Sequence, residues 1–120
     1  MCGFLAIFKK KRINLDKKKF ISSAKLLSHR GPDQAGQYFD EFFFSKFYRL
    51  SILDSSSKGM QPMFSADKRY LLLFNGEIYN APELRKKIGI NKFFGSSDTE
   101  VLLNCLIRFK EKTLSLIDGM

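Results

Sequence analysis

The sequence predicts an α+β fold built on antiparallel sheets. Short apolar segments typical of strands follow one another closely, and helical patterns stand mostly before and after them. Strands that are neighbours in the sequence favour antiparallel sheets over a doubly wound parallel sheet. The chain has 120 residues, 44% of them hydrophobic, which is enough for one domain with a single core. Its 13 phenylalanines and lack of tryptophan indicate a core of Phe, Leu and Ile.

The first quarter of the chain carries a strand and a helix. Residues 3–8 are apolar and end at a run of lysines, so we expect a buried strand there. Asp16 can cap a helix that continues to about Ser28. The helix has one apolar face, formed by Phe20, Ala24 and Leu27. It ends at Arg30-Gly31-Pro32-Asp33, because Gly and Pro together enforce a turn.

Turn residues and caps divide the remainder. Strands are predicted near 36–39 and 42–48, joined by a hairpin turn at residues 40–41. Extended segments are expected at 50–53 and 69–74, the second ending at the turn Asn75-Gly76. A short helix should run from Pro82 through Lys87, and Ser97 or Asp98 should cap the longest helix. Cys105 lies on the apolar stripe of that last helix and is expected in the core.

The net charge of +9 raises the question of an acidic partner. The runs Lys9-Lys10-Lys11-Arg12 and Lys17-Lys18-Lys19 could contact the phosphates of nucleic acid or an anionic membrane. Lysines are spread over most of the chain, however, and only Phe20 lies close enough to the runs to stack on a base. We therefore expect a solvated basic surface and no nucleic-acid partner.

The sequence also lacks targeting and metal-binding signals. No apolar run approaches the roughly 18 residues needed to span a bilayer, and the opening apolar segment is too short for a signal peptide. Cys2 stands where myristoylation requires glycine. We therefore expect a cytoplasmic protein without membrane association. Two cysteines and one histidine, His29, form neither a disulfide framework nor a metal cluster.

The most informative position is Cys2, which becomes the N-terminal residue when Met1 is removed. A terminal cysteine combines a thiol nucleophile with an α-amine of pKa about 7.7–8.0, which can accept a proton near neutral pH. Taken alone, Cys2 is better explained as a small buried residue at the start of a strand. The rest of the chain changes that balance.

Six polar clusters share one order along the chain, although each alone is explained by a helix stop, a turn or a cap. The clusters are Cys2-Gly3, His29 to Asp33, Arg49 to Asp54, Gly59 to Met63, Phe74 to Asn80 and Ser97 to Glu100. Together they resemble the glutaminase domain of class II glutamine amidotransferases, the N-terminal-nucleophile type. Pro32 and the string Asn75–Asn80 are most similar to the glutamine-hydrolysing asparagine synthetase branch of that class.

The resemblance implies that the chain hydrolyses glutamine to glutamate and ammonia through a thioester on Cys2. The Asn75 side chain and the Gly76 N–H would stabilise the oxyanion. Arg49 offers a planar fork for the α-carboxylate of glutamine, and Asp98 a carboxylate for its α-ammonium. Arg30 is expected to brace the site, and His29 to be structural because the α-amine already supplies a base. The implied glutamine pocket also includes Leu50, Ser51, Ile52, Leu53 and Glu77.

The resemblance covers residues 2–120 and implies a four-layer αββα sandwich of antiparallel sheets that is incomplete at its C-terminal end. The resemblance also implies an ATP-dependent synthetase domain that uses the ammonia and is not contained in these residues. We therefore expect ATP and Mg to bind in that domain, and this fragment to need no cofactor or metal. The expected partners are glutamine and the synthetase domain, and a homodimer of the full-length enzyme is left open.

Two other functions stay open from the sequence. Relatives in surface-polysaccharide pathways amidate a sugar rather than aspartate, so the acceptor is not fixed. A non-catalytic basic module would instead bind an acidic partner through the lysine runs. An electrophilic glutamine analogue would label Cys2 in an amidotransferase and not in such a module.

Overall fold

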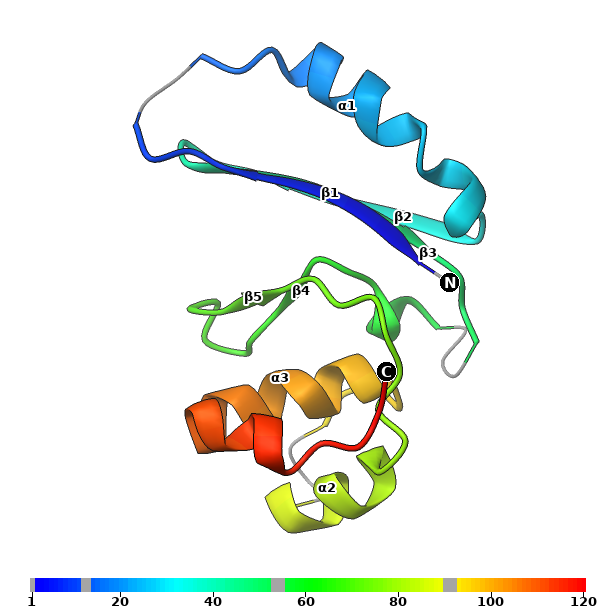
Figure 1. The fold of residues 1–120 in the computed structure, drawn as a ribbon, viewed down its shortest axis with the longest axis vertical. Helices are drawn as coiled ribbons and strands as arrows, with labels where there is room; N and C mark the ends of the chain where they lie inside the picture. Colours follow the sequence, from blue (N-terminus) through cyan, green and yellow to red (C-terminus); the bar gives the residue numbers. More distant parts are fainter. Residues whose placement is uncertain (1, 12–13, 53–55, 90–92) are drawn as a thin grey trace.

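The computed structural model describes residues 2–11, 14–52, 56–89 and 93–120. Along the longest axis, helix α1 (Lys17–Lys25) covers a three-stranded sheet, a two-stranded sheet follows, and helices α2 (Ala81–Ile88) and α3 (Asp98–Phe109) form the opposite end (Figure 1). Both sheets are antiparallel. The predicted class, mixed helices and antiparallel sheets, is therefore confirmed.

The larger sheet consists of β1 (Gly3–Phe8), β2 (Gln34–Phe39) and β3 (Phe43–Arg49), in the order β1-β3-β2. The hairpin between β2 and β3 lies where it was predicted, because the Asp40 carboxylate accepts the N–H groups of Phe42 at 2.7 Å and Phe43 at 2.6 Å. The prediction that β1 is buried is wrong. It is an edge strand with alternating exposure, and Phe8 at its end is 74% exposed.

Helix α1 packs on one face of this sheet through aromatic side chains. Its predicted cap is confirmed, because Asp16 Oδ1 accepts the N–H groups of Lys18 at 2.8 Å and Lys19 at 3.3 Å. Phe20 makes edge-on contacts with Phe39 and Phe44, at centroid distances of 5.8 and 5.6 Å. The helix is shorter than predicted, and a 3-10 turn, η1 (Ser28–Arg30), completes the path to the following turn.

The smaller sheet is shorter than the sequence suggests. After the 3-10 turn η2 (Ser57–Gly59), strand β4 (Met63–Phe64) pairs with β5 (Leu71–Leu72). The strand predicted over 69–74 is therefore only two residues long, because β4 offers only two residues for pairing. No strand is assigned at 50–52, the described part of the extended segment predicted over 50–53. Phe64 contacts Tyr38 edge-on at 5.2 Å, which links the two sheets.

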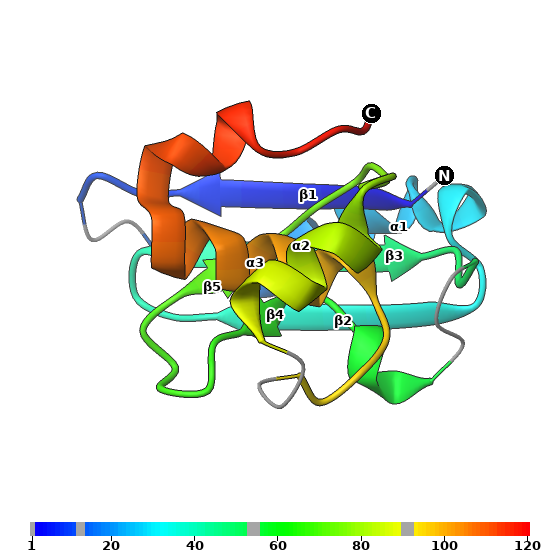
Figure 2. The same ribbon diagram turned by 90° about the horizontal axis from the view of Figure 1, so that it is seen from below.

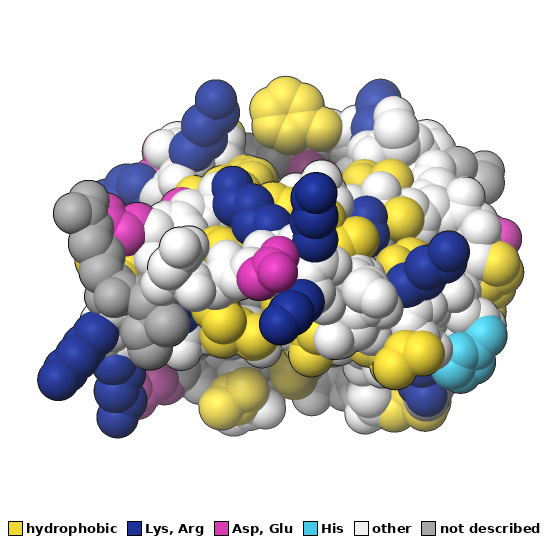
Figure 3. Space-filling view, turned by 90° about the horizontal axis from the view of Figure 1, so that it is seen from above, with side chains coloured by type: hydrophobic (Ala, Val, Ile, Leu, Met, Phe, Trp, Pro, Cys, Tyr) yellow, Lys and Arg dark blue, Asp and Glu magenta, His cyan; other side chains and the backbone are white. Residues whose placement is uncertain are grey.

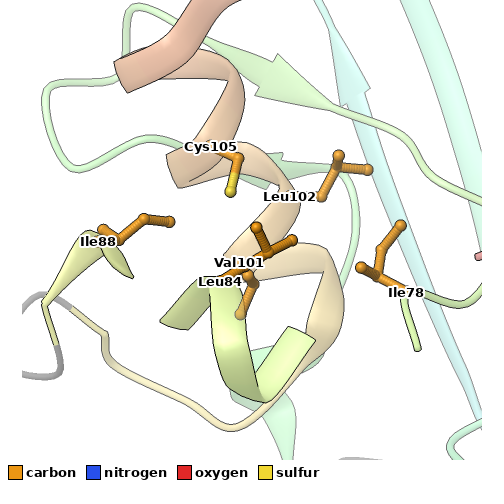
Figure 4. Close-up of a cluster of buried hydrophobic side chains, with 6 residues drawn as sticks. All are labelled: Ile78, Leu84, Ile88, Val101, Leu102 and Cys105. Carbon is orange, nitrogen blue, oxygen red and sulfur yellow. The ribbon is translucent and has the colours of Figure 1, made fainter. Parts of the chain in front are cut away.

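Helices α2 and α3 enclose the main apolar cluster. As predicted, Pro82 lies in the first turn of α2, and Ser97 caps α3 by accepting the Glu100 N–H at 3.3 Å. Cys105 is fully buried, in agreement with its expected place in the core. In Figure 2 both helices lie across the two-stranded sheet. The six buried members of the cluster, drawn in Figure 4, are Ile78, Leu84, Ile88, Val101, Leu102 and Cys105.

The end of the described chain returns to the segment before α2. After the 3-10 helix η4 (Lys110–Ser115), Met120 and Glu77 exchange two backbone hydrogen bonds, at 2.9 and 3.0 Å. Asn80 adds side-chain bonds to the Leu116 carbonyl at 2.8 Å and the Asp118 N–H at 2.9 Å. Asn75-Gly76 is therefore a bend leading into a paired segment, not the turn of a hairpin with β5.

The lysine-rich surface is mostly exposed, as predicted, with one exception. Lys10, Lys17, Lys18 and Lys19 are exposed, whereas Lys9 is buried and its Nζ lies 4.5 Å from the centroid of the Phe44 ring. On the outer surface at the α1 end of the molecule, hydrophobic and uncharged groups separate the basic side chains (Figure 3). Within the described residues, no helix is long and apolar enough to cross a membrane.

Candidate active site

The predicted residues meet around one pocket of about 170 Å³. One part of its wall comes from the larger sheet, with Cys2 before β1 and Arg49 at the end of β3. The other part comes from the segment after β5 and from the start of α3. The lining residues are Cys2, Arg49, Leu50, Ile52, Gln61, Phe74, Asn75, Gly76, Glu77, Ser97, Asp98, Thr99 and Met120.

Cys2 is held at the rim by groups far away in the sequence. Its thiol lies against Leu50, with Sγ 3.4 Å from the Leu50 N and 3.7 Å from the Leu50 carbonyl oxygen. The Arg30 Nε donates to the Cys2 carbonyl at 3.0 Å. The side chain is half-buried, so the thiol is packed in place and still reaches the pocket. Arg30 therefore contacts the backbone of Cys2 and does not line the pocket itself.

The turn after α1 supports the same region through its backbone and one carboxylate. Asp33 N–H donates to the Arg49 carbonyl at 3.1 Å, and Asp33 Oδ2 accepts the Ser51 N–H at 2.7 Å. A carboxylate that accepts a backbone N–H fixes the path of that backbone. The turn is thus more than a helix stop, because it holds the chain on both sides of Leu50.

Arg49 is 5% exposed, and its guanidinium forms part of the pocket wall. Nη1 donates to Gln34 Oε1 at 2.7 Å and to the Ser56 carbonyl at 2.8 Å. Gly59 packs against the guanidinium so closely that a Cβ built on it would lie 2.6 Å from Arg49 Cζ. The strand, the neighbouring strand and the η2 turn therefore fix one orientation of this cation.

Asn75 and Gly76 line the pocket, and each carries a hydrogen-bond donor. Among the described residues, neither the Asn75 side-chain amide nor the Gly76 N–H has a hydrogen-bond partner. Gly76 lies against the Met120 carbonyl, and a Cβ at this position would stand 2.6 Å from the Phe74 ring. Only glycine fits between these neighbours without displacing them. The bend therefore exposes two donors on a backbone packed from both sides.

Asp98 is 8% exposed and opens helix α3, where the positive end of the helix dipole favours a carboxylate. Its Oδ2 accepts the Ile78 N–H at 3.0 Å and its Oδ1 accepts the Thr99 N–H at 2.8 Å. An ionised carboxylate has about four acceptor positions, so two such bonds leave room for a ligand ammonium. The bond to Ile78 also ties Asp98 to the bend at Gly76.

The loop before α3 is fixed by two charged side chains, Glu100 and Arg85, for which no role was predicted from the sequence. Glu100 is 6% exposed and accepts the N–H groups of Phe94 at 2.7 Å and Gly95 at 2.8 Å. Arg85 of α2 donates to the carbonyls of Gly95 at 2.9 Å and Ser97 at 3.3 Å. These bonds set where α3 begins, and so where Asp98 stands.

Some predicted residues lie beside the pocket and not in its wall. Ser51 and Arg30 do not line it, and Leu53 falls outside the described residues. Exposed His29 lines a separate shallow hollow with Arg30. Glu77 does line the pocket, but its N–H and carbonyl pair with Met120, so its side chain is what it can offer a ligand.

Five lining residues were not predicted to belong to the site. One of them, Gln61, makes three side-chain hydrogen bonds. Its cluster, residues 59–63, was recognised in the sequence, but no role was assigned to it. The signal that could have found it is a polar side chain within an otherwise apolar Gly-Met-Gln-Pro-Met segment. The other four are Phe74, Ser97, Thr99 and Met120.

The remaining thiol has the properties of a core group. Burial raises the pKa of Cys105 above its ordinary value, with a small opposing effect of Lys87. A protonated, enclosed thiol is a poor nucleophile. Within the described residues, no group of three or more His, Cys, Asp or Glu side chains is arranged to hold a metal ion.

Comparison with known proteins identifies the family. Residues 1–120 match the family model of the glutamine amidotransferase domain, so the chain belongs to the class II glutamine amidotransferases. It is 40% identical over 125 residues to asparagine synthetase (glutamine-hydrolyzing) 1 of Bacillus subtilis (strain 168), and 36% identical over 121 residues to the asparagine synthetase (glutamine-hydrolyzing) of Zea mays. Both comparisons cover 100% of this chain and 20% of the relative, so the chain spans about a fifth of their length. The resemblance predicted from the six clusters is confirmed.

Proposed function

We propose that this chain hydrolyses glutamine to glutamate and ammonia, with Cys2 as the nucleophile once Met1 has been removed. The observation that carries the proposal is the shared pocket: Cys2, Arg49, Asn75, Gly76 and Asp98 come from separate segments and line one cavity. Nucleophile, oxyanion donors and two opposite charges are the groups that hydrolysis of a free amino-acid amide requires.

The reaction begins with transfer of the Cys2 thiol proton to the α-amine. The thiolate attacks the side-chain amide carbon of glutamine and a C–S bond forms. The tetrahedral oxyanion then collapses and the C–N bond breaks. The leaving nitrogen takes the proton from the α-ammonium group of Cys2 and departs as ammonia. Water then adds to the γ-glutamyl thioester, the C–S bond breaks, and glutamate leaves as the thiol regains its proton.

The oxyanion is stabilised by the Asn75 side-chain amide and the Gly76 N–H. Donors held in place before the reaction need no reorganisation when the negative charge develops, and losing one typically costs about 2.7–4 kcal/mol of barrier. The close packing of Gly76 between Phe74 and Met120 supports this role, because it restricts movement of the backbone that carries the Gly76 N–H.

Glutamine is recognised by its two charged ends. Arg49 binds the α-carboxylate and Asp98 binds the α-ammonium. Both side chains are nearly buried, where Coulomb interactions are stronger than in water. Leu50, Ile52 and Glu77 complete the wall of the pocket. The position of the amide carbon is then set by the length of the glutamine side chain, which gives selectivity over shorter amides.

The names of the relatives suggest where the ammonia goes. We propose that it is transferred to aspartate in an ATP-dependent asparagine synthetase reaction, catalysed by a synthetase domain outside residues 2–120. ATP and Mg²⁺ would be bound in that domain, and no step described above uses them. The layer order of α1, the two sheets and the two helices supports the four-layer αββα sandwich as the arrangement of the complete domain (Figure 1).

The proposal is tested by glutamine hydrolysis and by the mass of the protein. We expect glutamate release from glutamine, an intact mass that lacks Met1, and labelling of Cys2 by an electrophilic glutamine analogue. Cys2→Ala should abolish both labelling and glutamate release, whereas Cys105→Ala should retain them because Cys105 lies in the core. Glutamate release by Cys2→Ala at the wild-type rate would refute the proposal.

A further inference from the structure

Gln61 lies in the loop between η2 and β4, and it is 3% exposed. Its side-chain amide makes three hydrogen bonds. Oε1 accepts the Phe74 N–H at 2.6 Å, Nε2 donates to the Phe74 carbonyl at 3.0 Å, and Nε2 also donates to Thr99 Oγ1 at 3.3 Å. The amide therefore pairs with both backbone groups of one residue, as a neighbouring strand would.

The paired residue directly precedes the two oxyanion donors. Strand β5 ends at Leu72, so the ladder with β4 does not extend to Phe74. The Gln61 amide instead forms the hydrogen bonds that a paired strand would make with Phe74. Asn75 and Gly76 come directly after Phe74 in the chain. A buried amide is costly unless its hydrogen bonds are made, so the geometry of Phe74 is tightly coupled to Gln61.

The third bond connects the same amide to the other end of the pocket. Thr99 is the second residue of α3 and follows Asp98 directly. One side chain thus joins the segment that carries the oxyanion donors to the helix end that carries the carboxylate. These two groups act on different parts of glutamine, and their separation must match the length of the substrate.

We infer that Gln61 is a positioning residue for glutamine hydrolysis: it aligns the Asn75 and Gly76 donors with Asp98. The inference rests on the proposed function, because it assigns a role within that reaction. Gln61 lines the pocket, but it affects the reaction through its hydrogen bonds to Phe74 and Thr99 and does not react with the substrate itself.

Two variants separate positioning from simple packing. Gln61→Met keeps the length of the side chain and removes all three hydrogen bonds. Gln61→Glu keeps the acceptor for the Phe74 N–H and, when ionised, turns an oxygen toward the Phe74 carbonyl. When protonated, the introduced carboxyl group can donate to that carbonyl again, and burial favours the protonated form.

We expect kcat of Gln61→Met to fall by about 10- to 100-fold, because displacing donors by about 1 Å has that effect, with KM changed by less than about threefold. Alkylation of Cys2 by iodoacetamide should keep its wild-type rate, since displacement at a CH₂ carbon forms no oxyanion. For Gln61→Glu, the ratio of its kcat to the wild-type kcat should rise as the pH is lowered from about 8 to about 6, because the protonated carboxyl group can donate to the Phe74 carbonyl.

Two controls match these changes. Gln37→Met makes the same substitution at an exposed position of β2, and Leu84→Ala truncates a core side chain of α2 without removing a hydrogen bond of the site. Both should keep kcat within about twofold at temperatures where the protein is folded.

The outcomes are distinct. A wild-type protein that releases no glutamate refutes the proposed function, and the role of Gln61 falls with it. An active wild type with an unchanged kcat in Gln61→Met overturns the positioning role and leaves the proposed function standing. Loss of kcat together with alkylation of Cys105, which is fully buried in the folded protein, also overturns it when Leu84→Ala reproduces both effects, because the effect is then one of stability.

Discussion

Substitution of Gly59 by alanine tests the proposed role of Arg49 in binding the α-carboxylate of glutamine. Gly59 belongs to the η2 turn and is buried against the guanidinium of Arg49. A Cβ at this position would clash with Arg49 Nη2 and lie 2.6 Å from Arg49 Cζ, whereas ordinary contact begins at 3.4 Å, so the guanidinium must retreat by at least about 0.8 Å. A shift of that size breaks the alignment of Nη1 with Gln34 and Ser56, at present 2.7 and 2.8 Å away.

The magnitude follows from the bond that is misaligned. A hydrogen bond between charged groups contributes about 1.5–3 kcal/mol. At about 1.36 kcal/mol per factor of ten, Gly59→Ala should lower kcat/KM for glutamine by about 10- to 150-fold. The carboxylate is bound in the ground state and the transition state alike, so the change should fall mainly on KM.

The assay is glutamate release as a function of glutamine concentration, with thermal unfolding as a check of the fold. Lys58→Ala is the matched control, because Lys58 is the exposed neighbour within the same turn. Adding Arg49→Lys to Gly59→Ala should cause little further loss, since both changes remove one interaction. A folded Gly59→Ala protein with the wild-type KM would refute the assignment of Arg49 to the α-carboxylate.

Two further predictions concern the oxyanion donors and the hairpin of the larger sheet. Asn75→Ala should lower kcat by about 10²- to 10³-fold in steady-state kinetics, and an unchanged kcat would exclude Asn75 as a donor. Backbone N–H groups of Phe42 and Phe43 lower the pKa of Asp40, so the ionised carboxylate stabilises the folded state. This stabilisation is fully present above the unfolded pKa of about 3.9, and it is lost as the pH falls through the folded pKa. In urea unfolding, Asp40→Asn should therefore destabilise the protein at neutral pH by less than about 1 kcal/mol, and the difference should vanish in acid; a pH-independent difference would contradict this.

The features that the sequence predicts well are local ones. Asp16 and Ser97 cap their helices through N–H groups two or three residues away, so the neighbouring sequence suffices to recognise them. The hairpin at Asp40 depends on the same kind of short-range bond. Arg49 and Asp98 could be proposed as site residues from the sequence only because their clusters resemble a family, and the structure places both in the pocket wall.

Features that depend on distant partners could not be derived in the same way. The segment 69–74 has a strand-like pattern, but its length as a strand is set by β4, which pairs over only two residues. The role of Gln61 depends on Phe74 and Thr99, 13 and 38 residues further along the chain. No local rule relates a glutamine before a proline to either partner, so its place in the pocket required the structure.

The contacts of Cys2 have a consequence for the order in which the chain folds. Its thiol packs on Leu50, 48 residues away, and the opposite wall of the pocket contains Asp98 and Met120. Contacts between such distant segments form late, since long loops must close before they are rewarded. Cys2 is synthesised long before Asp98 and Met120, so its pocket cannot be complete until those segments follow. Glutamine hydrolysis should accordingly appear in a nascent chain only after its helices and the β2–β3 hairpin have formed.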